Sequence, residues 1–389
     1  MVSTPSPLAR TRNFLRAHSA VLSVAIATTL GVAPSAQSCA FDLVKPERTA
    51  IDWIVDATTL VLAHTRPGNS FSFEIATVLV GPPDPEPIPH LVDSALRRKM
   101  AKNPNASVLF AQTAGGKWRR VAYVDGAFED VLKAALAKRD DWRSGMTQDR
   151  IEFVVALQNS PDPRHKALLI GELDKVSYAQ LRKLDLRMSD KELISDLWSP
   201  EGYAFQAIRV LLLGLTGTDD ARSAVSSVVE RAMDSGSTNN LGAFVAAYIE
   251  LGGTTAIKSV SDGFLANGSA PTPVLEQVVT ALSVHRSLVN DEGQRSIDAA
   301  IRNLVHARPD AAAIVAKQFG SRSDWTQVDV LEPLMRNRKL TTKDALWAVS
   351  GYVVNARSMS RSEPDDTLRI RNLSRGSAVA NSKVAPVAN

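Results

Sequence analysis

The chain has 389 residues, of which 44% are hydrophobic and 22% are charged, and its formal net charge is +4. This composition is that of a folded protein and excludes a disordered chain, while the length predicts two domains with further segments at the ends. Residues 1–40 and 358–389 together hold eight basic and three acidic residues, so the rest of the chain has a net charge of −1. No nucleic-acid partner is expected, because no basic stripe stands out in the sequence.

Residues 1–40 have the pattern of an export signal. Three arginines and no acidic residue occur in this segment, and the stretch 20–33 is uncharged and ends before Pro34. Its 14 residues would span about 21 Å as a helix, less than the ~30 Å hydrocarbon core of a bilayer, so a cleaved signal peptide is predicted and a permanent span is not. An organellar transit peptide is the alternative, but the compact uncharged block favours export.

Cys39 is the only cysteine and has three candidate fates. Cleavage before Phe41 would discard it, whereas cleavage after Ser38 would leave it as the first mature residue, where a bacterial lipoprotein carries its acyl chains. The third fate is a buried thiol. One cysteine allows no disulfide within the chain, so stability must come from packing. The predicted location is the periplasm or the extracellular space, with membrane attachment only through the signal peptide or a lipidated Cys39.

Residues 41–142 are predicted to form a small β-rich domain. The pattern from residue 51 to 123 is strand-like, with expected strands at 58–66, 71–81, 107–112 and 117–123. Glycines between the last two strands predict a hairpin, and the five prolines of 81–89 predict a surface loop. A helix over 125–142 is expected to close the domain. The strand sequences 59–63 and 73–81 resemble those of exported OB-like or netrin-like domains.

Residues 143–357 are predicted to be helical throughout. Helical runs are expected at 146–159, 163–176, 177–184, 189–198, 272–288, 294–307, 310–319, 324–337 and 342–356. The segments 203–233 and 241–267 are each expected to form a helix, a glycine-bearing turn and a second helix, with the two turns 36 residues apart. "LLLGLTGTDDARSAV" and "YIELGGTTAIKSV" resemble the HEAT-like α-solenoid class, which implies stacked helical hairpins. An irregular all-helical bundle is the alternative, and residues 358–389 are expected to be a mobile tail.

No catalytic, cofactor-binding or metal-binding motif is found in the sequence. The six histidines lack ligand spacing, and the pair Asp219–Asp220 is interpreted as a helix cap because it follows Gly217 and Thr218. An enzyme would need a site between the β-rich domain and the first helices, and five residues could supply it: His64, His90, Asp141, Arg143 and His165. That hypothesis requires at least three of them to converge.

The sequence therefore favours a chain that is mainly α with a small β-rich amino-terminal domain, α+β overall, with a HEAT-like helical-repeat body. The expected function is that of an exported, non-enzymatic binding or scaffold protein of the cell envelope with a protein partner. An enzyme and a protein anchored to the membrane by lipid at Cys39 are the alternatives.

Overall fold

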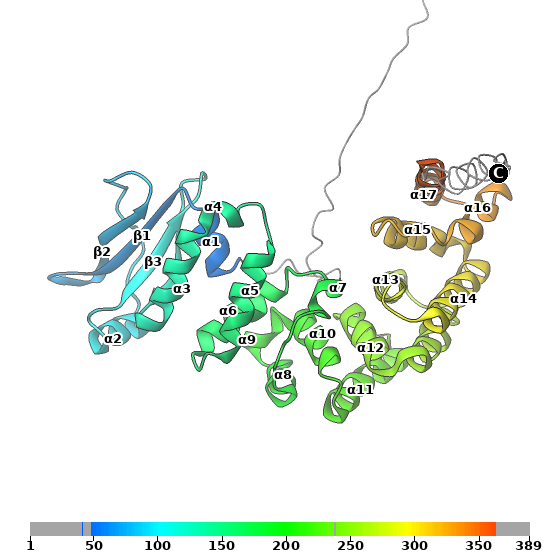
Figure 1. Ribbon diagram of the computed structural model, residues 1–389, viewed down its shortest axis with the longest axis horizontal. Coiled ribbons are helices and arrows are strands. Elements are labelled where there is room, and N and C mark those ends of the chain that lie inside the picture. The colour runs from blue at the N-terminus through cyan, green and yellow to red at the C-terminus, as the bar shows by residue number, and fades with distance from the viewer. Residues whose placement is uncertain (1–40, 42–47, 237–238, 363–389) are drawn as a thin grey trace, which may run out of the picture. The chain divides into compact units, whose positions relative to one another are not determined.

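The computed structural model describes residues 41, 48–236 and 239–362, which fall into one compact unit. Most of the elements are helices, and a four-stranded antiparallel sheet lies near the amino terminus (Figure 1). This confirms the expected mainly helical chain with a small β-rich part. The predicted signal peptide, Cys39 and residues 363–389 of the predicted tail lie outside the described residues.

The four expected strands are confirmed as β1 (Thr59–Arg66), β2 (Asn69–Val80), β3 (Ser107–Gln112) and β4 (Trp118–Val124). They lie in the order β2-β1-β3-β4, and each neighbouring pair is antiparallel. Gly116, at φ 73°, occupies the left-handed region in the turn of the expected β3–β4 hairpin. The OB-like resemblance stays a prediction, since an OB fold is a five-stranded, partly open barrel and the described residues form four strands.

Both faces of the sheet are covered. Leu60, Leu109 and Ala111 on one face join the main hydrophobic core, whereas Val61 and Phe110 on the other face join a separate cluster. Alternation along β1 and β3 places neighbouring residues on opposite faces in this way. The second cluster is closed by the loop 81–93 and by the helix α2 (Ser94–Lys102).

The strand-like prediction is wrong for residues 51–56, which belong to helix α1 (Ala50–Asp56). The helix begins with a capping box in which the Thr49 side chain accepts from the Asp52 backbone N–H and the Asp52 carboxylate accepts from the Thr49 backbone N–H. Its buried residues, Ile51, Ile54 and Val55, have helical spacing. Helix α2 was likewise not expected from the sequence.

The expected closing helix is divided in two at Lys138. It consists of α3 (Gly126–Ala137), which begins at the Asp125 cap, and α4 (Arg139–Trp142). The main core continues from these helices into the helical body without interruption. The body contains α5 (Gln148–Ala156), α6 (Pro163–Leu173), α7 (Tyr178–Leu181), α8 (Asp190–Asp196), α9 (Pro200–Tyr203), α10 (Gln206–Thr216), α11 (Asp219–Ser235), α12 (Leu241–Val260), α13 (Thr272–His285), α14 (Asp291–Ala307), α15 (Ala312–Gly320), α16 (Val328–Arg336) and α17 (Lys343–Ser362).

The first expected helical hairpin is confirmed as α10 and α11, with Gly217 at φ 70° in the turn and Thr218 as the cap of α11. The second shares the predicted break at glycine, because the helical geometry of α12 is interrupted at Gly253 (φ 55°, ψ −138°), but its two parts meet at a kink and not at a capped turn like that of the first. The HEAT-like repeat therefore stays a prediction. Helix α17 runs to Ser362, six residues past its expected end at 356.

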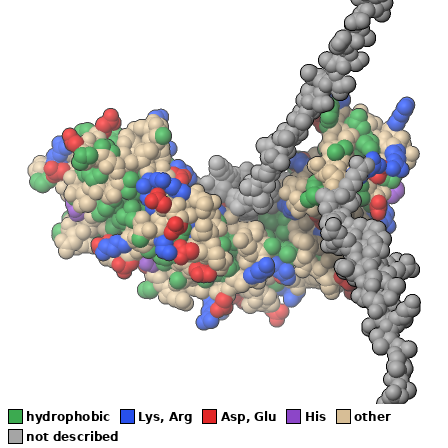
Figure 2. Space-filling view, turned by 45° about the horizontal axis from the view of Figure 1, so that its top comes forward, with side chains coloured by type: hydrophobic (Ala, Val, Ile, Leu, Met, Phe, Trp, Pro, Cys, Tyr) green, Lys and Arg blue, Asp and Glu red, His purple; other side chains and the backbone are tan. Residues whose placement is uncertain are grey.

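Acidic and basic side chains are interspersed on the face of the molecule shown in Figure 2. This agrees with the near-neutral charge of the chain between its two ends. Among the described residues, none of the helices combines the length and the apolar character that a membrane span requires.

Candidate functional site

The five residues considered for an enzyme make their contacts in different places. His90 Nε2 lies 3.0 Å from the backbone oxygen of Trp118, and Arg143 donates to the backbone oxygen of Val55. His64 lies on β1 opposite Glu74 of β2, and Asp141 accepts a hydrogen bond from Ser144 through its backbone oxygen. Within the described part of the chain, no hydrogen bond or ion pair joins any two of the five, so the convergence that this hypothesis requires is not found.

His165 forms a serine–histidine pair, with its Nδ1 atom 2.7 Å from Ser160 Oγ. Ser160 Oγ also accepts a hydrogen bond from the Asp162 backbone N–H, just before the start of α6. In a catalytic triad a carboxylate orients the second imidazole nitrogen, whereas His165 Nε2 is buried without a hydrogen-bond partner among the described residues. The pair therefore lacks the orienting group of a nucleophilic site.

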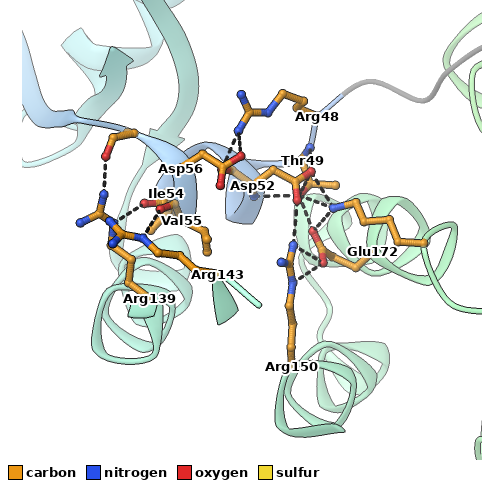
Figure 3. A network of polar contacts seen from close by, with 12 residues as sticks. Arg48, Thr49, Asp52, Ile54, Val55, Asp56, Arg139, Arg143, Arg150 and Glu172 are labelled. Carbon is orange, nitrogen blue, oxygen red and sulfur yellow. Dashed lines mark hydrogen bonds and ion pairs between the residues drawn. The ribbon is translucent and has the colours of Figure 1, made fainter. Parts of the chain in front are cut away.

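A buried ionic network joins α1 to α5 and α6 (Figure 3). Arg150 of α5 donates to Glu172 of α6 from Nε at 2.8 Å and to Asp52 of α1 from Nη2 at 2.8 Å. Lys175 Nζ lies 2.6 Å from Asp52 Oδ2 and 2.7 Å from Glu172 Oε1. Thr49 donates to Glu172 and so completes the contacts of a carboxylate that is fully buried. We refer to these five residues as the α1 joint.

The α1 joint is electrically balanced, with two carboxylates and two cations. Burial alone would raise the pKa of Asp52, but the charge of Lys175 and the hydrogen bonds from Lys175 and Arg150 outweigh burial and hold that pKa below its ordinary value. Each charge is thus compensated by a partner, as buried charges must be. The arrangement leaves no carboxylate free to act on a substrate, and its role is structural.

The other end of α1 is held by two arginines. Arg139 of α4 donates from Nε to the backbone oxygen of Ile54 at 2.9 Å and also to that of Ala57 (Figure 3). Arg143 donates to Val55 at 3.4 Å. The last carbonyls of a helix lack partners within the helix, and cationic donors at that end also oppose its dipole. Arg143, considered above for catalysis, therefore stabilises the end of α1.

The helical body contains a hollow of about 680 Å³ bordered by α7, α10, α12 and the residues after α13. Its apolar lining includes Leu184, Leu186, Leu215 and Leu288, which are only partly buried. Lys183 at this site is exposed, and its side chain makes no hydrogen bond or ion pair with another described residue. We call this feature the leucine hollow. Its leucines and its unpaired lysine side chain suit a ligand in which an apolar group lies next to a negatively charged group.

Glu250 of α12 lies in the wall of the leucine hollow, and both its oxygens are engaged. Tyr178 donates to Oε2 at 3.0 Å and Arg182 Nε donates to Oε1 at 3.1 Å. His285 lies behind this carboxylate, with Nδ1 3.9 Å from Oε2. Two elements, α7 with its C-cap Arg182 and α13, thus converge on one acidic side chain of α12 and fix the position of the wall.

The two aromatic groups behind the wall keep their neutral forms. Burial raises the pKa of Tyr178 well above its ordinary value, and the charge of Glu250 adds to this effect. Burial also lowers the pKa of His285 to about 3, with the positive charge of Arg182 acting in the same direction. Tyr178 therefore remains a hydrogen-bond donor and His285 remains uncharged near neutral pH.

Neither the leucine hollow nor the α1 joint was predicted from the sequence. The hollow brings together residues between 179 and 288, and each of its leucines has the spacing of an ordinary amphipathic helix. The capping box of α1 is the one local signal that could have located Asp52.

Among the described residues there is no group of three or more His, Cys, Asp or Glu side chains that could hold a metal ion. Asp219 and Asp220 lie in the first turn of α11, where negative charge is favourable to the helix dipole, but the cap itself is Thr218.

The chain was compared with protein families, with curated proteins and with solved structures. None of the three comparisons finds a match.

Proposed function

We propose that the protein is an exported, non-enzymatic binding or scaffold protein of the cell envelope, whose helical body contacts a protein partner. The observation that carries this proposal is the leucine hollow, a concave surface in which partly exposed leucine side chains lie beside polar groups and a lysine whose side chain is unpaired. The signal-like pattern of residues 1–40 supports export. Stacked hairpins of the HEAT-like class would supply such a concave surface, which is a further reason to propose that architecture.

The partner that fits the leucine hollow is a protein segment with an exposed apolar side chain and a neighbouring acidic residue. The apolar side chain would be buried among Leu184, Leu186 and Leu215, and the acidic group would pair with Lys183. Glu250 would not repel that acidic group strongly, because Arg182 and Tyr178 already bind both its oxygens. Burial of one leucine-sized side chain contributes roughly 1.5–3 kcal/mol, so further contacts outside the hollow would have to supplement it.

Site-specific photo-crosslinking tests this function in the intact envelope. A photoreactive residue replaces Leu186 in one variant and the exposed Glu230 of α11 in a control variant. We expect one protein to be crosslinked from position 186 and not from position 230, and Lys183→Glu to abolish that crosslink while the matched exposed variant Lys191→Glu does not. Equal crosslinking from both positions, or none from either, would refute binding at the leucine hollow.

The mature amino terminus distinguishes the alternatives for export. Mass spectrometry of the protein recovered from its compartment should find either a first residue Phe41 or an acylated Cys39, and the second result would establish the lipid-anchored form. A chain that retains residues 1–40 intact would contradict cleavage of an export signal.

A further inference from the structure

Two apolar side chains project into solvent beside each other on the sheet. Phe71 of β2 is 58% exposed, and Leu91, in the loop between β2 and α2, is 76% exposed. Leu91 forms an isolated β-bridge with Ser72, and the Val92 backbone N–H donates to the Phe71 backbone oxygen at 2.9 Å. Side chains this exposed form a protrusion and not the floor of a groove. We call Phe71 and Leu91 the apolar tip.

Cationic side chains border the apolar tip on two sides. On one side, the Arg97 guanidinium of α2 lies over the Phe71 ring, 4.5 Å from its centroid. On the other side, Leu91 forms part of the rim of a polar hollow of about 400 Å³. The hollow is bordered by His90, Leu91, Asp93, Arg119 and Arg120.

One guanidinium in the polar hollow has no counterion. Arg120 pairs with Asp93 at 2.7 Å, and Asp93 also accepts from the Leu96 backbone N–H as the cap of α2. The exposed side chain of Arg119, by contrast, makes no hydrogen bond or ion pair with another described residue. An uncompensated guanidinium is a planar donor that suits a phosphate group. Here it lies in the same hollow as an exposed leucine.

The surrounding segment is strongly basic. Residues 91–120 contain seven basic residues and a single acidic one, Asp93. Helix α2 packs on the sheet through Leu96 and Met100. Arg98 and Lys102, which are exposed, each follow one of these by two residues and therefore lie about 200° around the helix, on its outer side. Their charges would attract an anionic surface that approaches within a Debye length of about 8 Å.

From this arrangement we infer that the apolar tip and the cations beside it bind the surface of an anionic lipid bilayer. Leu91 and Phe71 enter the boundary between headgroups and acyl chains, and a lipid phosphate pairs with Arg119 in the polar hollow. A bilayer admits a protruding side chain because its lipids move aside, whereas a protein partner would need a matching pocket. Nucleic acid would use the cations but would gain little from the apolar tip. The inference depends neither on the leucine hollow nor on an acyl chain at Cys39.

Cosedimentation with lipid vesicles tests the binding. The protein is recovered from its compartment as the Cys39→Ser variant, so that no acyl chain is attached at that position. We expect it to bind vesicles of phosphatidylcholine and phosphatidylglycerol in equal parts, to bind less as the salt concentration rises, and not to bind vesicles of phosphatidylcholine alone. Equal binding to both kinds of vesicle, or binding to neither, overturns the inference.

Substitutions separate the two parts of the contact. Arg119→Glu should weaken binding about twentyfold, because the reversal removes two units of charge and each contributes about fivefold. Leu91→Ser should weaken binding about tenfold. The controls Lys191→Glu and Trp347→Ser alter equally exposed side chains elsewhere and should bind normally. All four variants should keep the melting temperature of the parent, since the side chains are exposed. A loss with Arg119→Glu but not with Leu91→Ser overturns the inference, because the surface would then attract any polyanion.

A fluorescent label shows whether the apolar tip enters the bilayer. In the Cys39→Ser background, an environment-sensitive fluorophore is attached to Leu91→Cys and, as a control, to Glu230→Cys on the exposed side of α11. With the anionic vesicles we expect the emission from position 91 to shift to shorter wavelength and to be quenched by spin-labelled lipids, and the emission from position 230 to stay unchanged. No response from position 91, or the same response from both positions, overturns the proposed insertion.

Discussion

Replacing Arg150 by methionine tests whether the α1 joint stabilises the fold. The substitution keeps an unbranched apolar stem but leaves Glu172, whose side chain is fully buried, with only Lys175 and Thr49 as partners. Removing one partner of a buried ion pair costs about 3–5 kcal/mol of the free energy of unfolding. With about 2.1 cal/mol/K of unfolding entropy per residue over roughly 300 residues, each kcal/mol corresponds to about 1.6 °C, so the melting temperature should fall by about 5–8 °C.

Urea unfolding, followed by circular dichroism and tryptophan fluorescence, measures this loss. In the double variant Arg150→Met with Glu172→Met the stranded carboxylate is absent, so we expect it to be more stable than Arg150→Met alone. Lys133→Met, which removes an exposed ion pair with Glu129, is the control and should leave the midpoint unchanged. An unchanged midpoint for Arg150→Met, or a double variant that loses the sum of the two single losses, would refute the reasoning.

Three further predictions concern the packing of the helical body. Burial lowers the pKa of His285 from an ordinary value of 6.5 to about 3, so between these values the unfolded chain binds a proton that the folded chain does not. The free energy of unfolding should therefore fall by up to about 1.4 kcal/mol for each pH unit below 6.5. His285→Leu should flatten this dependence between pH 6.5 and 4, and equal slopes for the two proteins in urea titrations would contradict the assignment. In Gly242→Ala the new Cβ would lie 2.9 Å from Phe41 Cδ1, so a loss of about 1–3 kcal/mol is expected, and Phe41→Leu should recover part of it in a double-variant cycle. Gly214→Ala should lower the melting temperature, because its Cβ would lie 2.9 Å from the backbone of α12. Gly351→Ala should raise the melting temperature at low protein concentration, because it removes a glycine from the interior of a helix where a Cβ meets no other atom. A change of the same sign in both variants would argue against the close approach at Gly214.

The sheet could be predicted from the sequence because its signals are local. Phe71, Phe73 and Ile75 alternate along β2, and the glycines between β3 and β4 mark the hairpin. Helix α1 was mistaken for strand because its seven residues are too few to establish a helical period and it runs almost directly into the apolar β1. Helix α2 has one buried residue, Met100, so it has almost no apolar stripe to recognise.

The break predicted at Gly252–Gly253 is confirmed, since the helical geometry of α12 is interrupted at Gly253. Gly253 adopts φ 55°, which only glycine enters at little cost, and regular helix continues after it to Val260. The aligned position in the first hairpin is followed by a cap at Thr218, whose side chain accepts from the Ala221 backbone N–H. Because both breaks contain glycine, the sequence predicts where each helix is interrupted but does not distinguish a capped turn from a kink.

The candidate site was beyond prediction for a different reason. Lys183, Leu215 and Glu250 come from three separate parts of the chain, and each has an ordinary local explanation as a solvated charge or a core residue. Arg143 shows the converse, since its charge suggested catalysis while its contacts are with a helix end. Only the tertiary arrangement decides whether a charged side chain is compensated within the fold or available to a ligand.

The α1 joint connects parts of the chain that a disulfide could otherwise connect. Lys175 reaches Asp52 across 123 positions of sequence, and a disulfide closing a loop of about 100 residues would contribute roughly 4–5 kcal/mol in the chain-entropy account. A disulfide acts mainly on the unfolded chain and is insensitive to pH, whereas the α1 joint acts in the folded chain through charges. Because the pKa of Asp52 is lowered on folding, its contribution is present above its ordinary value of 3.8 and is lost as the pH falls through the folded value. Acid should therefore weaken the contact of α1 with α5 and α6 only below about pH 3.8, whereas the effect of His285 begins below pH 6.5. In an Asp52→Asn variant the slope of stability against pH below 3.8 should be smaller than in the unmodified chain.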